Sequence, residues 1–202
     1  FAPAAVLAAG LQVHVKDASG QPVADAVVYA ESATAQTLSK PAAGVEIQQK
    51  DRKFLPLVTV IQTGNQVLFP NNDSVRHHIY SFSPAKKFEQ KLYSGSAAAP
   101  VVFDKAGVVV LGCNIHDKML AYVYVVDTPY FGKTDASGKF RLEQLPAGKY
   151  SVKVAHYHTV SSGAVAEQSV QVKGDGDVLH YKLSLKPEVK ARPADYDYEY
   201  TR

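Results

Sequence analysis

Three residues that can bind a soft metal ion lie close together in the second half of the sequence. Cys113 and Met119 are the only cysteine and the only methionine of the 202-residue chain, and His116 lies between them. Upstream, His77 and His78 follow a polar segment that reads PNNDS. A single cysteine cannot form an intramolecular disulfide, whereas thiolate, thioether and imidazole groups are all ligands for soft or borderline metals. The sequence therefore predicts a metal site formed by the Cys113–Met119 segment and an upstream histidine.

The chemistry of these side chains favours copper. Two imidazoles and a thiolate in a plane, with a weakly bound axial thioether, are the ligands of a mononuclear type 1 (blue) copper site that transfers electrons. Zinc sites use several cysteines or histidines and rarely methionine, and calcium or magnesium would require oxygen ligands. With four protein ligands, such a site has no open position for a substrate. We therefore predict one bound copper ion, an electron-transfer role and no enzymatic activity.

The elements that must position these residues are β-strands. Apolar and polar residues alternate along many short segments rich in β-branched and aromatic side chains, and no segment shows a sustained helical period. Turns containing Gly, Pro, Asn and Asp separate them. The pattern predicts an all-β protein made of sandwiches. The predicted strands are residues 11–16, 26–31, 57–62, 66–69, 78–82, 107–112, 120–126, 139–142, 149–156, 167–173 and 179–185.

Residues 55–127 resemble the cupredoxins. The segment GVVVLGCNIHDKMLAYVYVV is similar to their C-terminal copper loop, and its Cys-x2-His-x2-Met spacing is similar to that of the amicyanins. QTGNQVLFPNNDSVRHHIYSF resembles the region that supplies their first histidine. The resemblance implies that Cys113 is the equatorial thiolate and Met119 the axial ligand. It also implies that His77 is the buried imidazole and His116 the more exposed one.

Two residues near the first histidine are candidates for a supporting role or an alternative ligand, His78 and Asn72. In the cupredoxins the residue after the first histidine is often an asparagine that braces the copper loop, so the resemblance implies such a role for His78. Strand alternation points His77 and His78 to opposite faces, and only one of them should reach the metal. We favour His77 as the ligand.

The loop itself departs from the amicyanin pattern. Ile115 stands where a proline precedes the histidine, and Asp117 and Lys118 occupy positions that are apolar in amicyanins. The apolar docking patch implied by the resemblance is therefore not reproduced here. The redox potential and the identity of the partner do not follow from the sequence.

The segments on either side of the copper region resemble two parts of one carboxypeptidase-regulatory-like (transthyretin-like) sandwich. LQVHVKDASGQPVADAVVYA and TDASGKFRLEQLPAGKYSVKVAH share an Asp-Ala-Ser-Gly turn. We predict a cupredoxin-like sandwich inserted in, or packed on, a second regulatory-like (transthyretin/Ig-like) sandwich, an arrangement that resembles methylamine-utilisation-type periplasmic proteins. The sequence leaves open whether the first strands belong to the outer sandwich or complete the cupredoxin sheet. The predicted division is residues 1–10 (arm or signal-peptide remnant), 11–44 (first outer strands), 45–127 (copper domain), 128–186 (remaining outer strands) and 187–202 (flexible Tyr-rich tail).

Charge and hydropathy restrict the location and the partners. The net charge of +3 is spread without a basic run, which argues against a nucleic-acid partner. No stretch approaches the roughly 20 apolar residues that a membrane-spanning helix requires. The opening FAPAAVLAAG is typical of the region around a secretory cleavage site and predicts export to the periplasm. The cupredoxin resemblance implies a redox partner such as a dehydrogenase or cytochrome c. The oligomeric state is not determined.

Several alternatives remain open at this point. The protein could sequester or deliver copper, with His78 shifting onto the metal, instead of carrying electrons. Cys113 alone could be a buried structural residue, or it could act with His116 as a thiol hydrolase, although no orienting partner motif is present. His156 and His158 form a His-x-His pair, for which a half-exposed strand end is favoured over a second metal site.

The C-terminal tail carries a separate possibility. Tyr196, Tyr198 and Tyr200 would share one face of an extended segment, which would permit addition of a strand to a partner's sheet. A solvated tail is the favoured interpretation.

Overall fold

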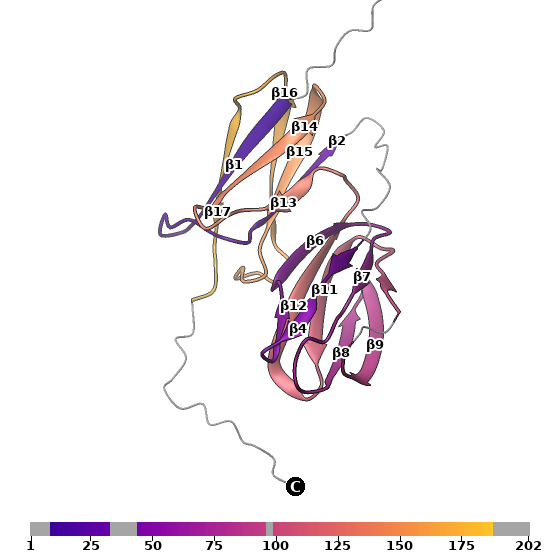
Figure 1. Ribbon diagram of the computed structural model, residues 1–202. Helices are drawn as coiled ribbons and strands as arrows, with labels where there is room; N and C mark the ends of the chain where they lie inside the picture. Colours follow the sequence, from indigo (N-terminus) through magenta and orange to yellow (C-terminus); the bar gives the residue numbers. More distant parts are fainter. Residues whose placement is uncertain (1–8, 33–43, 96–98, 188–202) are drawn as a thin grey trace, which may run out of the picture.

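Every regular element that the structure describes is a β-strand (Figure 1). The computed structural model describes residues 9–32, 44–95 and 99–187. The predicted N-terminal arm and Tyr-rich tail lie almost entirely outside these residues. The described part of the chain contains no helix, and therefore none that is long and apolar enough to cross a membrane. The all-β prediction is confirmed.

The candidate ligands lie in a sandwich formed by the middle of the chain. Its larger sheet has the order β6-β12-β11-β8-β9, and a smaller sheet has the order β10-β7-β3. A short β4-β5 hairpin completes this part of the fold. The bounds are β3 Val45–Glu46, β4 Gln48–Lys50, β5 Lys53–Leu55, β6 Val58–Gln62, β7 Gln66–Leu68, β8 His77–Ser83, β9 Lys86–Tyr93, β10 Val101–Val102, β11 Gly107–Cys113 and β12 His116–Val126.

The second sandwich combines the beginning and the end of the described chain. Its two sheets have the orders β14-β1-β17 and β13-β2-β15-β16. Figure 1 shows the two sandwiches as separate stacks, with β1 and β2 among the later strands. The bounds are β1 Ala9–Asp17, β2 Val27–Ser32, β13 Phe131–Lys133, β14 Lys139–Leu145, β15 Gly148–Ala155, β16 Val165–Val172 and β17 Val178–Leu183.

Strand pairing answers the question that the sequence left open about β1 and β2. β1 pairs antiparallel with β14 and parallel with β17, whereas β2 pairs with β13 and β15. Both strands therefore belong to the outer sandwich, and the strands from β3 to β12 are inserted between β2 and β13. The resemblance of the outer sandwich to regulatory-like domains remains a prediction.

The alternation of side chains explains how the inner core forms around Cys113. On β11, Val109, Leu111 and Cys113 are buried, whereas the side chains of Val108 and Val110 are exposed. The side chains of consecutive strand residues point to opposite faces, so the inward row of β11 ends at the cysteine. Cys113 packs in a buried apolar cluster with residues from several other strands and loops. They are Ile47, Phe54, Ile61, Val67, Phe69, Ile79, Phe103, Met119, Ala121, Val123 and Val125.

An apolar and aromatic contact joins the two sandwiches. The ring of Tyr122 on β12 stacks on Tyr157 of the outer sandwich, with 4.8 Å between ring centroids. Lys133 on β13 donates hydrogen bonds to the carbonyl of Val58 on β6 at 2.8 Å and to the carboxylate of Asp25. A buried cluster of Val27, Val58, Tyr124 and Ala155 lies at the same junction.

Candidate metal centre

Three adjacent strand ends bring the predicted ligands together. His77 is the first residue of β8, Cys113 the last of β11 and His116 the first of β12. Because β11 pairs with both β8 and β12, Cys113 lies opposite Ile79 on one side and opposite His116 on the other. Strand pairing thus places the distant His77 beside the loop that carries the other candidate ligands.

The donor atoms of these three residues converge. His77 Nδ1 lies 3.8 Å from Cys113 Sγ, and His116 Nδ1 lies 3.6 Å from the same sulfur. All three ligand atoms lie within 4.8 Å of one another. Since metal bonds to imidazole nitrogen and thiolate sulfur are about 2.0–2.3 Å long, ligands of one ion lie roughly 3–4 Å apart. The three side chains therefore need little movement to bind one ion.

Burial makes this a poor place for a charged imidazole and a good one for a neutral ligand. His77 is fully buried and Cys113 is 3% exposed, while His116 is partly exposed. Burial lowers the pKa of His116, and the neighbouring His77 and Arg52 lower it further. Neutral imidazole has a nitrogen lone pair available for a metal. Within the described residues, no other group of three or more His, Cys, Asp and Glu side chains has metal-binding geometry.

Met119 lies in the same buried cluster as Cys113. It is 1% exposed and sits on β12, three residues after His116. Its thioether is therefore held inside the sandwich, on the side of the sheet that contains the cysteine. Its role as the axial ligand remains a prediction.

Asp73 is part of the site but was not predicted from the sequence. Its Oδ2 lies 3.0 Å from His77 Nε2, on the far side of the ring from Cys113. The backbone N–H groups of Arg52 and Ser74 donate to the same carboxylate at 2.7 and 2.9 Å. The Arg52 hydrogen bond is the main cause of the lowered pKa of Asp73. An ionised Asp73 favours the tautomer of His77 with the proton on Nε2, and this leaves Nδ1 free for a metal.

The two candidate supporting residues lie outside the cluster of ligand atoms. His78 Nε2 lies 2.7 Å from Glu89 Oε1 on the adjacent strand β9. Asn72 donates from its amide to Gln48 Oε1 at 3.1 Å. The structure thus directs both side chains toward other partners and not toward Cys113.

A different asparagine braces the loop before β8. Asn71 is 3% exposed, and its amide donates to the carbonyls of Val75 and Tyr93 at 2.9 and 2.8 Å. Its Oδ1 accepts from the backbone N–H of Asp73 at 3.0 Å. Asn71 therefore fixes the loop that presents both Asp73 and His77. Sequence alone does not distinguish it from its neighbour Asn72.

The His156 and His158 pair does not form a second metal site. His156 follows β15 and is 8% exposed, so it is buried and not half-exposed as predicted. Its Nδ1 accepts from the backbone N–H of His158 at 3.1 Å. Within the described residues, no third His, Cys, Asp or Glu side chain completes a metal-binding group with this pair.

Comparisons with known proteins give fold likenesses over part of the chain. No family model matches the sequence, and no curated protein does. A purple cupredoxin from Nitrosopumilus maritimus is 24% identical, with 41% of this chain and 100% of that chain covered and a TM-score of 0.37. Amicyanin from Paracoccus versutus is 20% identical, with 48% and 100% covered and a TM-score of 0.38. A reduced amicyanin variant is 17% identical, with 48% and 99% covered and a TM-score of 0.37.

Proposed function

We propose that this protein is a one-electron carrier that binds a single type 1 copper ion through His77, Cys113 and His116, with Met119 as the axial ligand. The observation that carries the proposal is the convergence of two imidazole nitrogens and one thiol sulfur within 4.8 Å. A copper ion bound to such ligands supplies a Cu(I)/Cu(II) couple.

The environment of the ligands suits electron transfer. His77 and Cys113 are held in a packed core, and Asp73 fixes the ring of His77. Rigid ligands change little between the two oxidation states, and a small rearrangement favours fast transfer. His116 is the partly exposed ligand, so it offers an edge at which a partner can approach. A set of four protein ligands provides no substrate position, which supports a carrier and not an enzyme.

The location and the partner belong to the same proposal. We place the protein in the periplasm, where it would exchange electrons with a dehydrogenase or cytochrome c. The resemblance of residues 55–127 to cupredoxins supports this assignment.

Copper sequestration or delivery is the alternative function, and it would use labile ligands. In that case His78 would be expected to move onto the metal. The contact of His78 with Glu89, away from Cys113, gives no support to that movement.

Electrochemistry of the copper-loaded protein distinguishes the two functions. A carrier gives a reversible one-electron couple, and Met119→Leu shifts its potential while binding is largely retained, because the axial ligand is weak. Tight Cu(I) binding without a reversible couple would indicate copper handling. Loss of copper binding in Met119→Leu would contradict the axial assignment.

A further inference from the structure

The β4–β5 hairpin carries exposed positive charge that has no counter-charge in the protein. Lys50 and Lys53 lie directly opposite each other on the two strands, and Arg52 lies in the turn between them. Arg76 is the last residue before β8. All four side chains are exposed, and within the described residues none of them forms an ion pair. Like charges placed directly opposite destabilise a strand pair, so this arrangement does not serve the stability of the hairpin. These four residues form what we call the basic rim.

Backbone hydrogen bonds hold the hairpin against the loop before β8. Gln49 donates its N–H to the carbonyl of Pro70, and Asn72 donates its N–H to the carbonyl of Gln49, both at 2.8 Å. The N–H of Arg52 donates to Asp73, whose carboxylate contacts the ring of the buried histidine ligand. The basic rim is therefore fixed relative to the candidate metal centre.

The exposed edge of the metal centre lies beside this rim. His116 is the partly exposed candidate ligand, and its ring centroid lies 5.0 Å from that of His77. Burial is the main cause of its lowered pKa, and the charges of His77 and Arg52 add to the effect. Ile115, the residue before it, is 49% exposed. Protein interfaces commonly combine an apolar centre with a polar, solvent-accessible rim. The surface around His116 has this composition.

The balance of charge at this end of the molecule is positive. The hairpin turn and the two adjoining loops, residues 50–53, 70–76 and 114–118, carry five lysine and arginine residues and three aspartates. One of the three aspartates, Asp73, already contacts His77. A surface with an excess of cations attracts negatively charged partners and repels positively charged ones.

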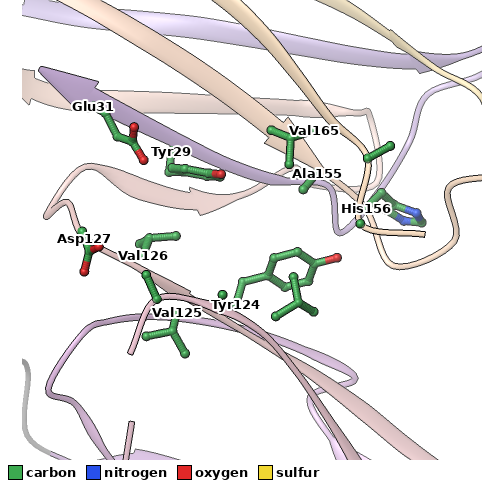
Figure 2. Close-up of a pocket in the computed structure, with 14 residues that line it drawn as sticks. Tyr29, Glu31, Tyr124, Val125, Val126, Asp127, Ala155, His156 and Val165 are labelled. Atoms are coloured by element: carbon green, nitrogen blue, oxygen red, sulfur yellow. The ribbon is translucent and has the colours of Figure 1, made fainter. Parts of the chain in front are cut away.

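Charged groups at the junction of the two sandwiches are arranged differently. Figure 2 shows the carboxylates of Glu31 and Asp127 there. Lys153 pairs with Glu31 at 2.7 Å, and the hydroxyl of Thr63 donates a hydrogen bond to Asp127. The junction thus satisfies its charged groups within the chain, whereas the basic rim leaves its cations available to another molecule.

We propose that the basic rim is the docking surface for a redox partner that presents carboxylates around its own electron-transfer site. This inference rests on the proposed one-electron function and specifies the charge of the partner. The partner's carboxylates would pair with Arg52 and Arg76, and its redox group would approach the exposed edge of His116. Charge would thus take the place of the apolar patch that the loop does not reproduce. Electrostatic attraction speeds association more than it tightens binding, which suits a carrier that must dissociate after each transfer.

Stopped-flow oxidation of the Cu(I)-loaded full chain by two inorganic probes tests this surface. Hexacyanoferrate(III) is an anion and tris(phenanthroline)cobalt(III) is a cation, and each takes one electron from Cu(I) to leave Cu(II). Added salt screens the interaction between exposed charges. It should therefore slow the reaction with the anion and accelerate the reaction with the cation. A rate with hexacyanoferrate(III) that does not fall as salt is added would overturn the proposal.

A neutral variant locates the docking surface. Arg52→Gln should lower the rate constant with hexacyanoferrate(III) about threefold at low ionic strength and raise the rate constant with the cobalt complex, because one cation near the exposed ligand is lost. A changed reduction potential would instead move both rates in the same direction. Lys182→Gln, which changes an exposed lysine on β17 of the outer sandwich, is the control and should alter neither rate. Unchanged rates in Arg52→Gln, or a shift of both rates in one direction, would refute the role of the rim.

The electrochemistry of the same sample separates this proposal from the proposed function. A reversible copper couple without any preference between the two probes would overturn the docking surface and leave the electron carrier intact. Absence of a reversible couple would remove the carrier function, and the docking surface with it.

Discussion

The carboxylate of Asp73 and Cys113 Sγ lie at opposite nitrogens of the His77 ring. Asp73 Oδ2 is 3.0 Å from Nε2, and the sulfur is 3.8 Å from Nδ1. A carboxylate bound to the outer nitrogen of a metal-binding histidine fixes the orientation of the ring and increases the basicity of the other nitrogen. His77 is therefore oriented toward Cys113 by a residue that does not itself approach the thiol.

Replacing Asp73 by asparagine should change the metal site without removing a ligand. Asp73→Asn keeps a similar shape but removes a negative charge. That charge stabilises Cu(II) more than Cu(I). We expect a higher reduction potential and a loss of Cu(II) affinity of about 10- to 100-fold. A redox titration and competition with a chelator measure the two effects. Asp104→Asn, which changes an exposed partner of Lys86, is the control. An unchanged potential would show that Asp73 has no electrostatic influence.

Individual substitution of the two adjacent histidines tests the choice of ligand. His77→Ala removes one of the three converging donor atoms and should abolish stoichiometric binding of Cu(II). His78→Ala removes a contact with Glu89 and should leave binding nearly unchanged. Isothermal titration calorimetry with Cu(II) compares the two variants. The reverse outcome, with binding lost only in His78→Ala, would require a different arrangement of the loop.

Most long strands could be predicted from sequence because one of their faces is buried. On β11, for example, the buried Val109 and Leu111 alternate with the exposed Val108 and Val110. The eight-residue β9 was missed. It lies at the edge of its sheet and carries Lys86, Lys87 and Lys91, as edge strands often do. Its polar composition hides the alternation on which the prediction depends.

The group of candidate ligands was predictable in part, because the types of the residues indicated it. Cys113, His116 and Met119 are close in sequence, and only the upstream histidine had to be inferred. Asp73 had no such signal, since its role depends on a hairpin. Asp51 and Arg52 form the two-residue turn between β4 and β5, with positive φ angles of 53° and 55°. The usual Asn-Gly or Asp-Gly signature of such turns is absent, so the Arg52 N–H that anchors Asp73 could not be foreseen.

The two Asp-Ala-Ser-Gly turns respond differently to the same substitution. Gly20 and Gly138 have φ angles of +89° and +71°. A Cβ at Gly20 would meet nothing within 4 Å, whereas one at Gly138 would lie 2.4 Å from the carbonyl oxygen of Val15. We expect Gly20→Ala to lower the free energy of unfolding by about 1 kcal/mol through backbone strain. Gly138→Ala should lower it by roughly 3 kcal/mol or more, because the backbone of β1 must also move.

Urea denaturation of both glycine variants measures this difference. Equal destabilisation would show that β1 and the later turn are not packed as described. The comparison is internally controlled, since both variants change the same tetrapeptide in the same way.

His156 should make the free energy of unfolding depend on pH. Burial lowers the pKa of His156 in the folded state. At a pH below the ordinary histidine pKa of about 6.5, the unfolded chain therefore binds more protons than the folded chain does. The free energy of unfolding should therefore fall as the pH drops from about 6.5 to the folded pKa, by at most about 1.4 kcal/mol per pH unit. Above pH 6.5, the ionisation of His156 should not change the free energy of unfolding.

His156→Asn should reduce this slope, as measured by denaturation at several pH values. His158→Asn is the matched control: the ring of His158 lowers the pKa of His156 less than burial does, so this variant should change the slope much less than His156→Asn does. Identical slopes in wild type and His156→Asn would mean that the imidazole of His156 is protonated equally well in both states.

The visible absorption spectrum of the Cu(II)-loaded protein tests the central claim most directly. Sulfur coordination by Cys113, together with nitrogen from His77 and His116, predicts an intense thiolate-to-copper charge-transfer band at one copper per chain. Cys113→Ser should lack that band while the fold is retained. A Cu(II) complex of the wild-type protein without the band, or a band that persists in Cys113→Ser, would contradict the assignment of the metal centre.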